Sequence, residues 1–197
     1  MHVMARRAPV PYDRGVKICI VSDSHDRAEP LRQAVLAAKA EGATAVIHCG
    51  DLIGAQSLKP ALAIGLPVHL IHGNNAGDPT ALHRLVASSG GLLQYHGPDA
   101  QIELAGRRIF LVHYDNYGYA MACTGDWALV CCGHSHHAEA RKVANVKGGE
   151  TWLVNPGTVA GLAAPATWML ADLAAMHFEL RTLDKTDSLS LTASIGA

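Results

Sequence analysis

The stretch "VKICIVSD", residues 16–23, decides the fold class of this chain. Its apolar, β-branched run is typical of a strand buried on both faces. The segment "EPLRQAVLAAKAEG", residues 29–42, follows with helical spacing of its apolar residues and a glycine at its end. A buried strand followed by an amphipathic helix is the first half of a βαβ unit, so the pattern predicts an α/β fold.

The alternation continues with "ATAVIHCGD" (43–51) as strand and turn, "QSLKPALAIG" (56–65) as a short helical piece interrupted by proline, and "PVHLIHGN" (67–74) as a third strand and turn. From about residue 92 the pattern changes to short strands joined by glycine-bearing turns, including a "KGGE" hairpin at 147–150. Neither an internal repeat nor a linker is visible. The sequence therefore predicts one α/β domain with mixed sheets over residues 16–183, a flexible lead-in at 1–15 and a loose tail at 184–197.

The composition is that of a globular chain, with 197 residues, 49% of them hydrophobic and 17% charged. A formal net charge of −1 gives no electrostatic reason to expect a nucleic acid or an anionic membrane as partner. No window approaches about 18 uninterrupted apolar residues, so no membrane span is expected. The five cysteines lack the spacing of a disulfide framework, which indicates reduced thiols and a cytoplasmic location.

Polar residues follow six of the predicted strands, at the point where each strand ends. In open α/β sheets the ligand crevice lies beyond the carboxyl ends of the strands, so these clusters are expected to converge. They contain two carboxylates, one amide and four imidazoles: Asp23, His25, Asp51, Asn74, His113, His134 and His136. This donor set suits manganese, iron, nickel or zinc rather than calcium, and seven ligands suit two ions that share a carboxylate.

Two details of this set depend on the local backbone. Asp23 and His25 are two residues apart, as are His134 and His136, and in an extended chain such side chains point the same way. Cys131 and Cys132 are interpreted as strand residues and not as half of a zinc site, because no second pair of short-spaced ligands answers them.

The remaining histidines and three glycines have simpler interpretations. We interpret five histidines as packed, hydrogen-bonded side chains, and expect a sixth, His137, to point away from the site; the five are His48, His69, His72, His83 and His96. Glycines that precede site residues serve as turn formers and leave room for the ions to approach, at Gly50, Gly73 and Gly133. Arg107 and Arg108 are expected in a solvated hairpin, from which an arginine could also reach a phosphate.

The ordered motifs "DSH", "GD", "GN", "H", "GHSH" and "NPGT", from Asp23 to Thr158, resemble the calcineurin-like metallophosphoesterase superfamily in its small single-domain phosphodiesterase branch. The resemblance implies two facing mixed β-sheets flanked by helices. It assigns Asp23, His25 and His136 to one metal ion, and it gives Asp51 the bridging role. It assigns the second ion to Asn74, His113 and His134.

The activity implied is that of a dinuclear-metal-dependent phosphodiesterase in which a metal-bridging hydroxide attacks the phosphorus atom of a small phosphodiester. Asp51, Asn74 and His134 are the expected catalytic residues, and the two divalent ions are manganese first, with iron, nickel or zinc as alternatives. Two other functions stay open: a catalytically silent scaffold that binds protein partners, and a nuclease or nucleotide pyrophosphatase on the same centre. The natural substrate and the formation of a homo-oligomer are also open.

The chain departs from the family pattern in two places. His113 is followed by "YDN" where the family commonly has glycine, and "GNNAGD" (73–78) replaces the usual "GNHD" or "GNCD". The amide of Asn75 cannot give up a proton near neutral pH, so the leaving group needs another acid, such as His72 or a metal-bound water, or must depart as an anion. Ala76 offers no carboxylate to orient an acid, and Asp78 lies two residues further along the sequence. The segment 155–158 is either a proline turn or a support of the site.

Overall fold

The computed structural model describes residues 16–183, so the predicted lead-in at 1–15 and tail at 184–197 lie outside the described residues. The first half of the chain contains β1 (Lys17–Val21), α1 (Ala28–Ala40), β2 (Ala43–His48), the 3₁₀ helix η1 (Ala55–Leu58), α2 (Lys59–Leu62), β3 (Val68–Leu70), α3 (Pro79–Ser88) and β4 (Leu93–Tyr95). The second half contains β5 (Asp99–Leu104), β6 (Arg107–Val112), α4 (Asp115–Cys123), β7 (Leu129–Cys131), β8 (Glu139–Ala144), β9 (Glu150–Asn155), β10 (Thr167–Asp172) and β11 (His177–Thr182).

Both sheets are mixed, as the sequence predicts. The first has the order β11-β10-β1-β2-β3-β4, in which β1 to β4 are parallel and β10 and β11 are antiparallel to their neighbours. The second has the order β5-β6-β7-β9-β8, with a parallel centre of β6, β7 and β9 and antiparallel edges. Parallel strands at the centre of each sheet direct their carboxyl ends to a common edge.

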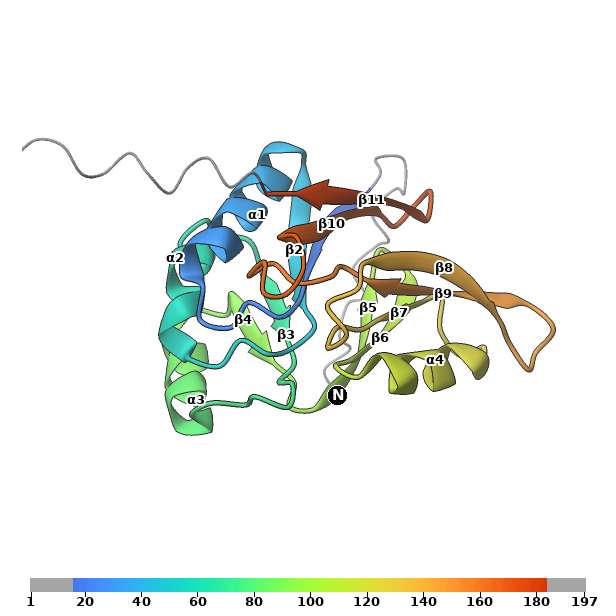
Figure 1. Cartoon of the computed structure of the whole chain (residues 1–197), viewed down its shortest axis with the longest axis horizontal. Helices are drawn as coiled ribbons and strands as arrows, with labels where there is room; N and C mark the ends of the chain where they lie inside the picture. Colours follow the sequence, from blue (N-terminus) through green and yellow to red (C-terminus); the bar gives the residue numbers. More distant parts are fainter. Residues whose placement is uncertain (1–15, 184–197) are drawn as a thin grey trace, which may run out of the picture.

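The two sheets face each other and are flanked by helices. Apolar side chains from both sheets fill the space between them, among them Ile20 and Ile47 from the first and Leu111 and Leu129 from the second. The outer face of the first sheet packs on α1, α2 and α3, and the outer face of the second packs on α4. Figure 1 shows α1 to α3 on one side of the molecule and α4 on the other. The expected four-layer α/β architecture is confirmed.

Two helices that the sequence pattern did not reveal are α3 and α4. The side chain of Asp78 caps α3 by accepting hydrogen bonds from the backbone N–H groups of Thr80 and Ala81. Asp78 is therefore a helix cap and not a carboxylate that orients Asn75. In α4 the glycine at 118 hid the helix, but a Cβ there would lie 3.1 Å from Cβ of Cys132, so glycine lets α4 pack closely on the second sheet.

The hairpin arginines do not reach the candidate site. Arg107 donates to the carbonyl oxygens of Leu173 and Ala174 at 3.0 and 3.1 Å, and the Arg108 guanidinium lies 4.8 Å from the Trp127 ring centroid. Both begin β6, whereas His113 follows the other end of that strand. The suggestion that one of them contacts a phosphate was wrong, because their partners hold them at the opposite edge of the sheet. None of the helices within residues 16–183 is long and apolar enough to cross a membrane.

Candidate metal centre

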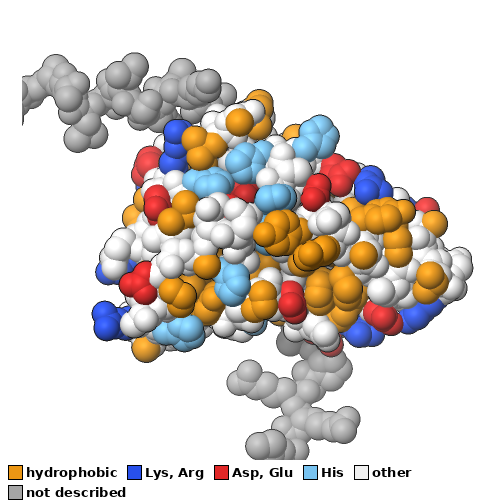
Figure 2. Space-filling model, turned by 60° about the horizontal axis from the view of Figure 1, so that its bottom comes forward, with side chains coloured by type: hydrophobic (Ala, Val, Ile, Leu, Met, Phe, Trp, Pro, Cys, Tyr) orange, Lys and Arg blue, Asp and Glu red, His pale blue; other side chains and the backbone are white. Residues whose placement is uncertain are grey.

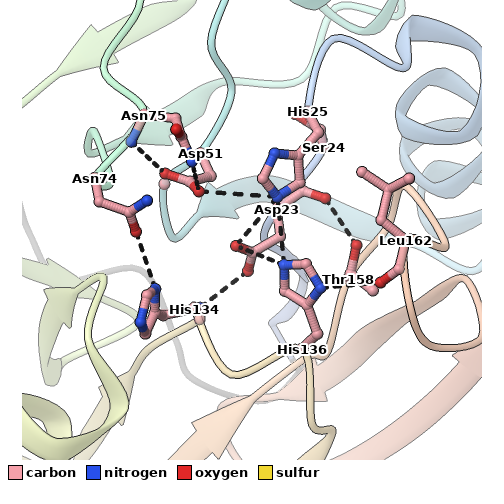
Figure 3. A network of polar contacts seen from close by, with 12 residues as sticks. Asp23, Ser24, His25, Asp51, Asn74, Asn75, His134, His136, Thr158 and Leu162 are labelled. Atoms are coloured by element: carbon pink, nitrogen blue, oxygen red, sulfur yellow. Dashed lines mark hydrogen bonds and ion pairs between the residues drawn. The ribbon is translucent and has the colours of Figure 1, made fainter.

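The structure brings all seven predicted residues to one edge of the two sheets. They follow β1, β2 and β3 of the first sheet and β6 and β7 of the second. Figure 2 shows several histidine side chains on one face of the molecule. In Figure 3, side chains from both sheets point toward one another: Asp23, His25, Asp51, Asn74, His134 and His136. Five sequence segments far apart in the chain therefore build one site.

The first half of the site consists of Asp23, His25 and His136. Oδ1 of Asp23 lies 3.8 Å from Nε2 of His25 and 3.4 Å from Nε2 of His136. Oδ2 of Asp23 accepts a hydrogen bond from the backbone N–H of His134, whereas the fully buried Oδ1 has no hydrogen-bond donor among the described residues. A buried carboxylate oxygen without a partner is costly unless a cation occupies the space in front of it.

Hydrogen bonding fixes which ring nitrogen of His136 faces that space. Nδ1 of His136 lies 2.9 Å from the carbonyl oxygen of Leu162, so in the neutral ring this nitrogen carries the proton. The Nε2 atom then presents a lone pair toward Asp23 and lies 3.3 Å from Nε2 of His25. Three electron-rich atoms thus converge, which is the arrangement of ligands around a metal ion.

The second half consists of Asp51, Asn74, His113 and His134. Nδ1 of His113 donates to the carbonyl oxygen of Cys49 at 2.8 Å, so its Nε2 lone pair faces Oδ1 of Asn74 at 3.0 Å. His134 approaches the same Asn74 oxygen, with Nδ1 at 2.9 Å. Asn74 and His134 are exposed, while Asp51 and His113 are buried. The buried pair forms the floor of this half and the exposed pair its rim.

Asp51 lies between the two halves. Its Oδ2 atom is 3.8 Å from Nε2 of His25 in the first half, and its Oδ1 atom is 3.4 Å from Nε2 of His113 in the second. A second group close enough to share one ion contains Asp23, Asp51 and His113. Asp23 thus lies within reach of both halves, which the expected assignment of Asp23 to one ion did not foresee.

The donor set fits a divalent transition metal. It offers carboxylate and amide oxygens with neutral imidazole nitrogens, and no thiolate takes part. Burial raises the pKa of the neighbouring Cys49 and Cys132 thiols, so both stay protonated. All five cysteines are unpaired.

The backbone at the site is left-handed at five of the seven residues. The φ angles are positive at Asp23 (53°), His25 (42°), Asp51 (55°), His134 (69°) and His136 (57°). Such values are uncommon for residues other than glycine, cost on the order of 1–3 kcal/mol each, and gather at functional sites. The prediction that an extended chain aligns Asp23 with His25, and His134 with His136, was wrong in its reason, because tight turns bring these side chains together.

Two glycines make room for the carboxylates. A Cβ atom at Gly73 would overlap Oδ1 of Asp51, and one at Gly133 would lie 2.8 Å from Oδ2 of Asp23 and overlap the Ser22 hydroxyl. Glycine at these two positions therefore leaves room for the carboxylate side chains of the site.

The segment 155–158 supports the site from behind. The buried Asn155 side chain donates to the carbonyl oxygen of Gly133 at 2.8 Å and to the Ser135 hydroxyl at 3.1 Å, and the Thr158 hydroxyl donates to the backbone carbonyl of Asp23 at 2.9 Å. These bonds hold the two turns that carry His134, His136 and Asp23. The sequence left open whether this segment is only a proline turn or supports the site, and these hydrogen bonds show that it supports the turns of the site.

The calcineurin-like phosphoesterase superfamily domain matches residues 16–176. The chain belongs to the calcineurin-like phosphoesterase superfamily. A phosphodiesterase of Methanocaldococcus jannaschii is 26% identical over 150 residues, which cover 74% of this chain and 86% of the relative. The resemblance stated from the motifs is thereby confirmed, and with it a family of phosphoric ester hydrolases.

Two solved structures share the fold of this chain. One, described as a novel archaeal phosphodiesterase, superposes with a TM-score of 0.76 at 23% identity and covers 85% of this chain and all of that one. Vacuolar protein sorting 29 of Cryptosporidium parvum superposes with a TM-score of 0.57 at 14% identity and covers 87% of this chain and 98% of that one. At these identities the likeness establishes the fold alone.

Asn75, which departs from the superfamily pattern, contacts the central carboxylate. Its backbone N–H donates to Oδ1 of Asp51 at 2.9 Å, and its side-chain Nδ2 donates to Oδ2 at 2.6 Å. His72, the other residue considered as an acid, hydrogen bonds to the Tyr95 hydroxyl through Nδ1. Asn75 is therefore placed beside the candidate metal centre, and sequence reasoning identified its position but not its contact.

His48 is a packed histidine that links the two halves. Its Nδ1 accepts from the backbone N–H of Gly50 at 3.2 Å, so the neutral ring carries its proton on Nε2 and donates it to the Ser24 hydroxyl at 3.0 Å. Burial lowers the pKa of His48 to about 3, with a further contribution from nearby His113. The interpretation of His48 as a satisfied core histidine is confirmed.

The other histidines read as packed also have hydrogen-bond partners. Nδ1 of His69 lies 3.1 Å from Nε2 of His96, and Nδ1 of His83 lies 2.7 Å from the carbonyl oxygen of Pro79. His137 is exposed. None of these side chains belongs to the groups that could share an ion.

Proposed function

We propose that this protein is a dinuclear-metal-dependent phosphodiesterase. The single observation that carries the proposal is the buried, unpartnered Oδ1 of Asp23, which faces two imidazole nitrogens. In a protein that no longer binds a metal ion, a substitution that removes this oxygen or gives it a hydrogen-bond donor would increase stability. All seven ligand positions are filled and converge on one site, which weighs against the scaffold function.

The proposed assignment follows the two halves. Asp23, His25 and His136 hold one ion; Asn74, His113 and His134 hold the other; Asp51 bridges them. Manganese is the first choice, with iron, nickel or zinc as alternatives, because the set combines oxygen and nitrogen donors. The contacts of Asp51 with histidines of both halves support its bridging role.

Two divalent ions, when bound, supply positive charge that neutralises phosphoryl oxygens and makes hydroxide available near neutral pH. The chain's own residues orient the substrate. The exposed Asn74 and His134 are positioned at the rim to contact a phosphoryl oxygen, while the buried Asp51 and His113 exclude water from below. A small phosphodiester suits this open rim. We further propose a cytoplasmic location, since the thiols are unpaired.

Hydrolysis of bis(p-nitrophenyl) phosphate tests the proposal. We expect turnover by the purified protein with manganese, loss of turnover after exhaustive chelation, and recovery when a divalent transition metal is returned. Activity that survives chelation would contradict the proposal. Complete inactivity with every metal tested, in a protein that binds them, would favour the scaffold function instead.

A further inference from the structure

Two tyrosines lie beside the second half of the site and take part in no step proposed so far. The Tyr114 ring centroid lies 4.7 Å from that of His134 and 5.5 Å from that of His113, and the Tyr117 ring centroid lies 5.4 Å from that of Tyr114. Tyr114 is half-buried, whereas Tyr117 is 58% exposed. We call this pair, Tyr114 and Tyr117, the aromatic platform.

The start of α4, which packs on the second sheet, holds the aromatic platform in place. Tyr114 is the residue before α4 and Tyr117 is in its first turn. The helix is anchored on the second sheet by the buried Gly118 and Ala122. Because the Tyr114 ring packs against the rings of His134 and His113, the aromatic platform adjoins the candidate metal centre.

Exposed aromatic rings next to a reacting centre offer a stacking surface for a flat ring. Such stacking is tolerant of sequence or ring type because it uses the π-face, and alanine substitution of a stacking residue weakens binding of a base about tenfold or more. Tyrosine also supplies a large apolar area with few rotatable bonds, so little conformational entropy is lost on binding.

We propose that the aromatic platform binds a planar aromatic ring carried by the phosphodiester, of which a nucleobase is the natural form. This inference rests on the proposed function and names its substrate class. With the phosphate at Asn74 and His134, one ester substituent extends over Tyr114 toward Tyr117. The formal charge of the chain, −1, favours a single nucleotide unit over a polymeric nucleic acid.

The chain provides a matched control for this proposal. Tyr119 lies on the same helix and is 48% exposed, but the Arg141 guanidinium lies 5.4 Å from its ring centroid, on the side away from Tyr117. Tyr117 contacts Tyr114 and neither histidine of the site by ring packing. Tyr117→Ala therefore removes half of the platform without removing the ring that touches His113 and His134.

The experiment compares thymidine 5′-(p-nitrophenyl phosphate) with its abasic counterpart, deoxyribose 5′-(p-nitrophenyl phosphate), using manganese-loaded protein. Both esters release p-nitrophenol, so the missing general acid affects them equally. We expect kcat/KM of the wild type to be about tenfold higher for the thymidine ester. The ratio should fall at least about threefold in Tyr117→Ala, which keeps the Tyr114 ring, and stay at the wild-type value in Tyr119→Ala.

Binding gives a second readout that does not depend on turnover. Calorimetric titration with adenosine monophosphate and with ribose 5-phosphate should show tighter binding of the nucleotide by the wild type and by Tyr119→Ala, and a reduced preference in Tyr117→Ala. If the wild type hydrolyses both esters equally well, or if Tyr117→Ala keeps the preference, the platform proposal is wrong while the phosphodiesterase proposal stands.

Two further outcomes overturn the platform in different ways. Hydrolysis of neither ester, together with equal binding of the nucleotide and ribose 5-phosphate, would remove the platform proposal; the phosphodiesterase proposal would fall with it only if bis(p-nitrophenyl) phosphate is not hydrolysed either. A change of oligomeric state in Tyr117→Ala, with the ester ratio unchanged, would show that the tyrosines cover a second copy of the chain and not a substrate ring.

Discussion

The two halves of the candidate metal centre use similar side chains but differ in how far the protein itself satisfies them. In the first half, Oδ1 of Asp23 has no hydrogen-bond donor within the described part of the chain and faces the Nε2 atoms of His25 and His136. In the second half, both oxygens of Asp51 accept hydrogen bonds from Asn75. The first half therefore depends more on a bound cation to balance its charge, whereas the second can keep its geometry through contacts within the protein.

A candidate metal site is therefore indicated by carboxylate oxygens that have no hydrogen-bond donor, and not only by the types of side chain that come together. Both halves are built on left-handed turns after parallel strands, and both place a backbone carbonyl behind a histidine, at Leu162 and at Cys49. Those carbonyls orient the rings in advance. Oδ1 of Asp23, which has no hydrogen-bond donor among residues 16–183, then gives the strongest support for the proposed cation site.

Substitution of Asp51 or Asp23 should have the largest effect on metal content and kcat, and the two variants should differ in how many ions they lose. Because Asp51 faces histidines of both halves, Asp51→Ala is expected to lose both ions and to reduce kcat by more than about 100-fold, the upper end for residues that only orient ligands. Asp23→Ala should lose chiefly one ion. Elemental analysis after gel filtration measures this, and a wild-type metal content in Asp51→Ala would show that the carboxylate does not bridge.

Removing the support behind both halves should have a smaller effect. Asn155→Ala deletes the donor to Gly133 and Ser135, so the turn that carries His134 and His136 loses its hold, and metal affinity should fall about 10–100-fold. Asn145→Ala is the control, because that side chain bonds the backbone of the β8–β9 hairpin. Equal losses of metal affinity in the two variants, measured by titration, would reduce the role of Asn155 to general stability.

Asn75→His should change which substrates are preferred. A histidine at this position can donate a proton to the leaving oxygen, so alkyl phosphodiesters, with basic leaving groups, should gain about tenfold relative to p-nitrophenyl diesters. The backbone hydrogen bond from residue 75 to Asp51 is kept in the variant. The measurement is kcat against leaving-group pKa; a shallow slope in the wild type that the substitution leaves unchanged would mean that another group already supplies the proton.

His48, which hydrogen bonds to Ser24 and to Gly50, should affect how protein stability depends on pH. Burial lowers the pKa of His48 from 6.5 to about 3, so between these values the unfolded chain binds a proton that the folded chain does not. The stabilising effect of neutral His48 is present above pH 6.5 and is lost as pH falls, at up to about 1.4 kcal/mol per pH unit.

The variant His48→Gln isolates this contribution, since glutamine keeps a donor and an acceptor but does not titrate in this range. Between pH 6.5 and about pH 5 the wild type should lose roughly 1.5 kcal/mol more unfolding free energy than the variant, as measured by urea denaturation in the presence of chelator. Identical pH dependence in the two proteins would mean that His48 is not held neutral.

The α/β class, the first three strands and the positions of the polar clusters could be predicted from the sequence because buried parallel strands have a simple pattern. The runs "ICIV" (18–21) and "AVI" (45–47) are apolar, and each is followed by polar residues where the strand ends. The helix α4 could not be predicted, since its glycine is explained only by the neighbouring sheet. The turns at Asp23 and His134 were misjudged because their left-handed backbone is imposed by tertiary contacts.

The contacts that complete the site were also beyond the sequence. The carbonyl oxygens of Cys49 and Leu162 that orient His113 and His136 belong to residues whose side chains carry no signal of that role. The bond from Asn75 to Asp51 joins two positions 24 residues apart. Tyr114 was visible only as a departure from the family pattern, and its meaning depends on the helix that follows it.

The proposed site holds two ions with Asp51 between them, and anomalous scattering from manganese-soaked crystals tests this arrangement most directly. We predict two anomalous peaks, one in contact with Asp23, His25 and His136 and the other with Asn74, His113 and His134, both within coordination distance of Asp51. A single peak at saturating manganese, or peaks away from these residues, would contradict the account.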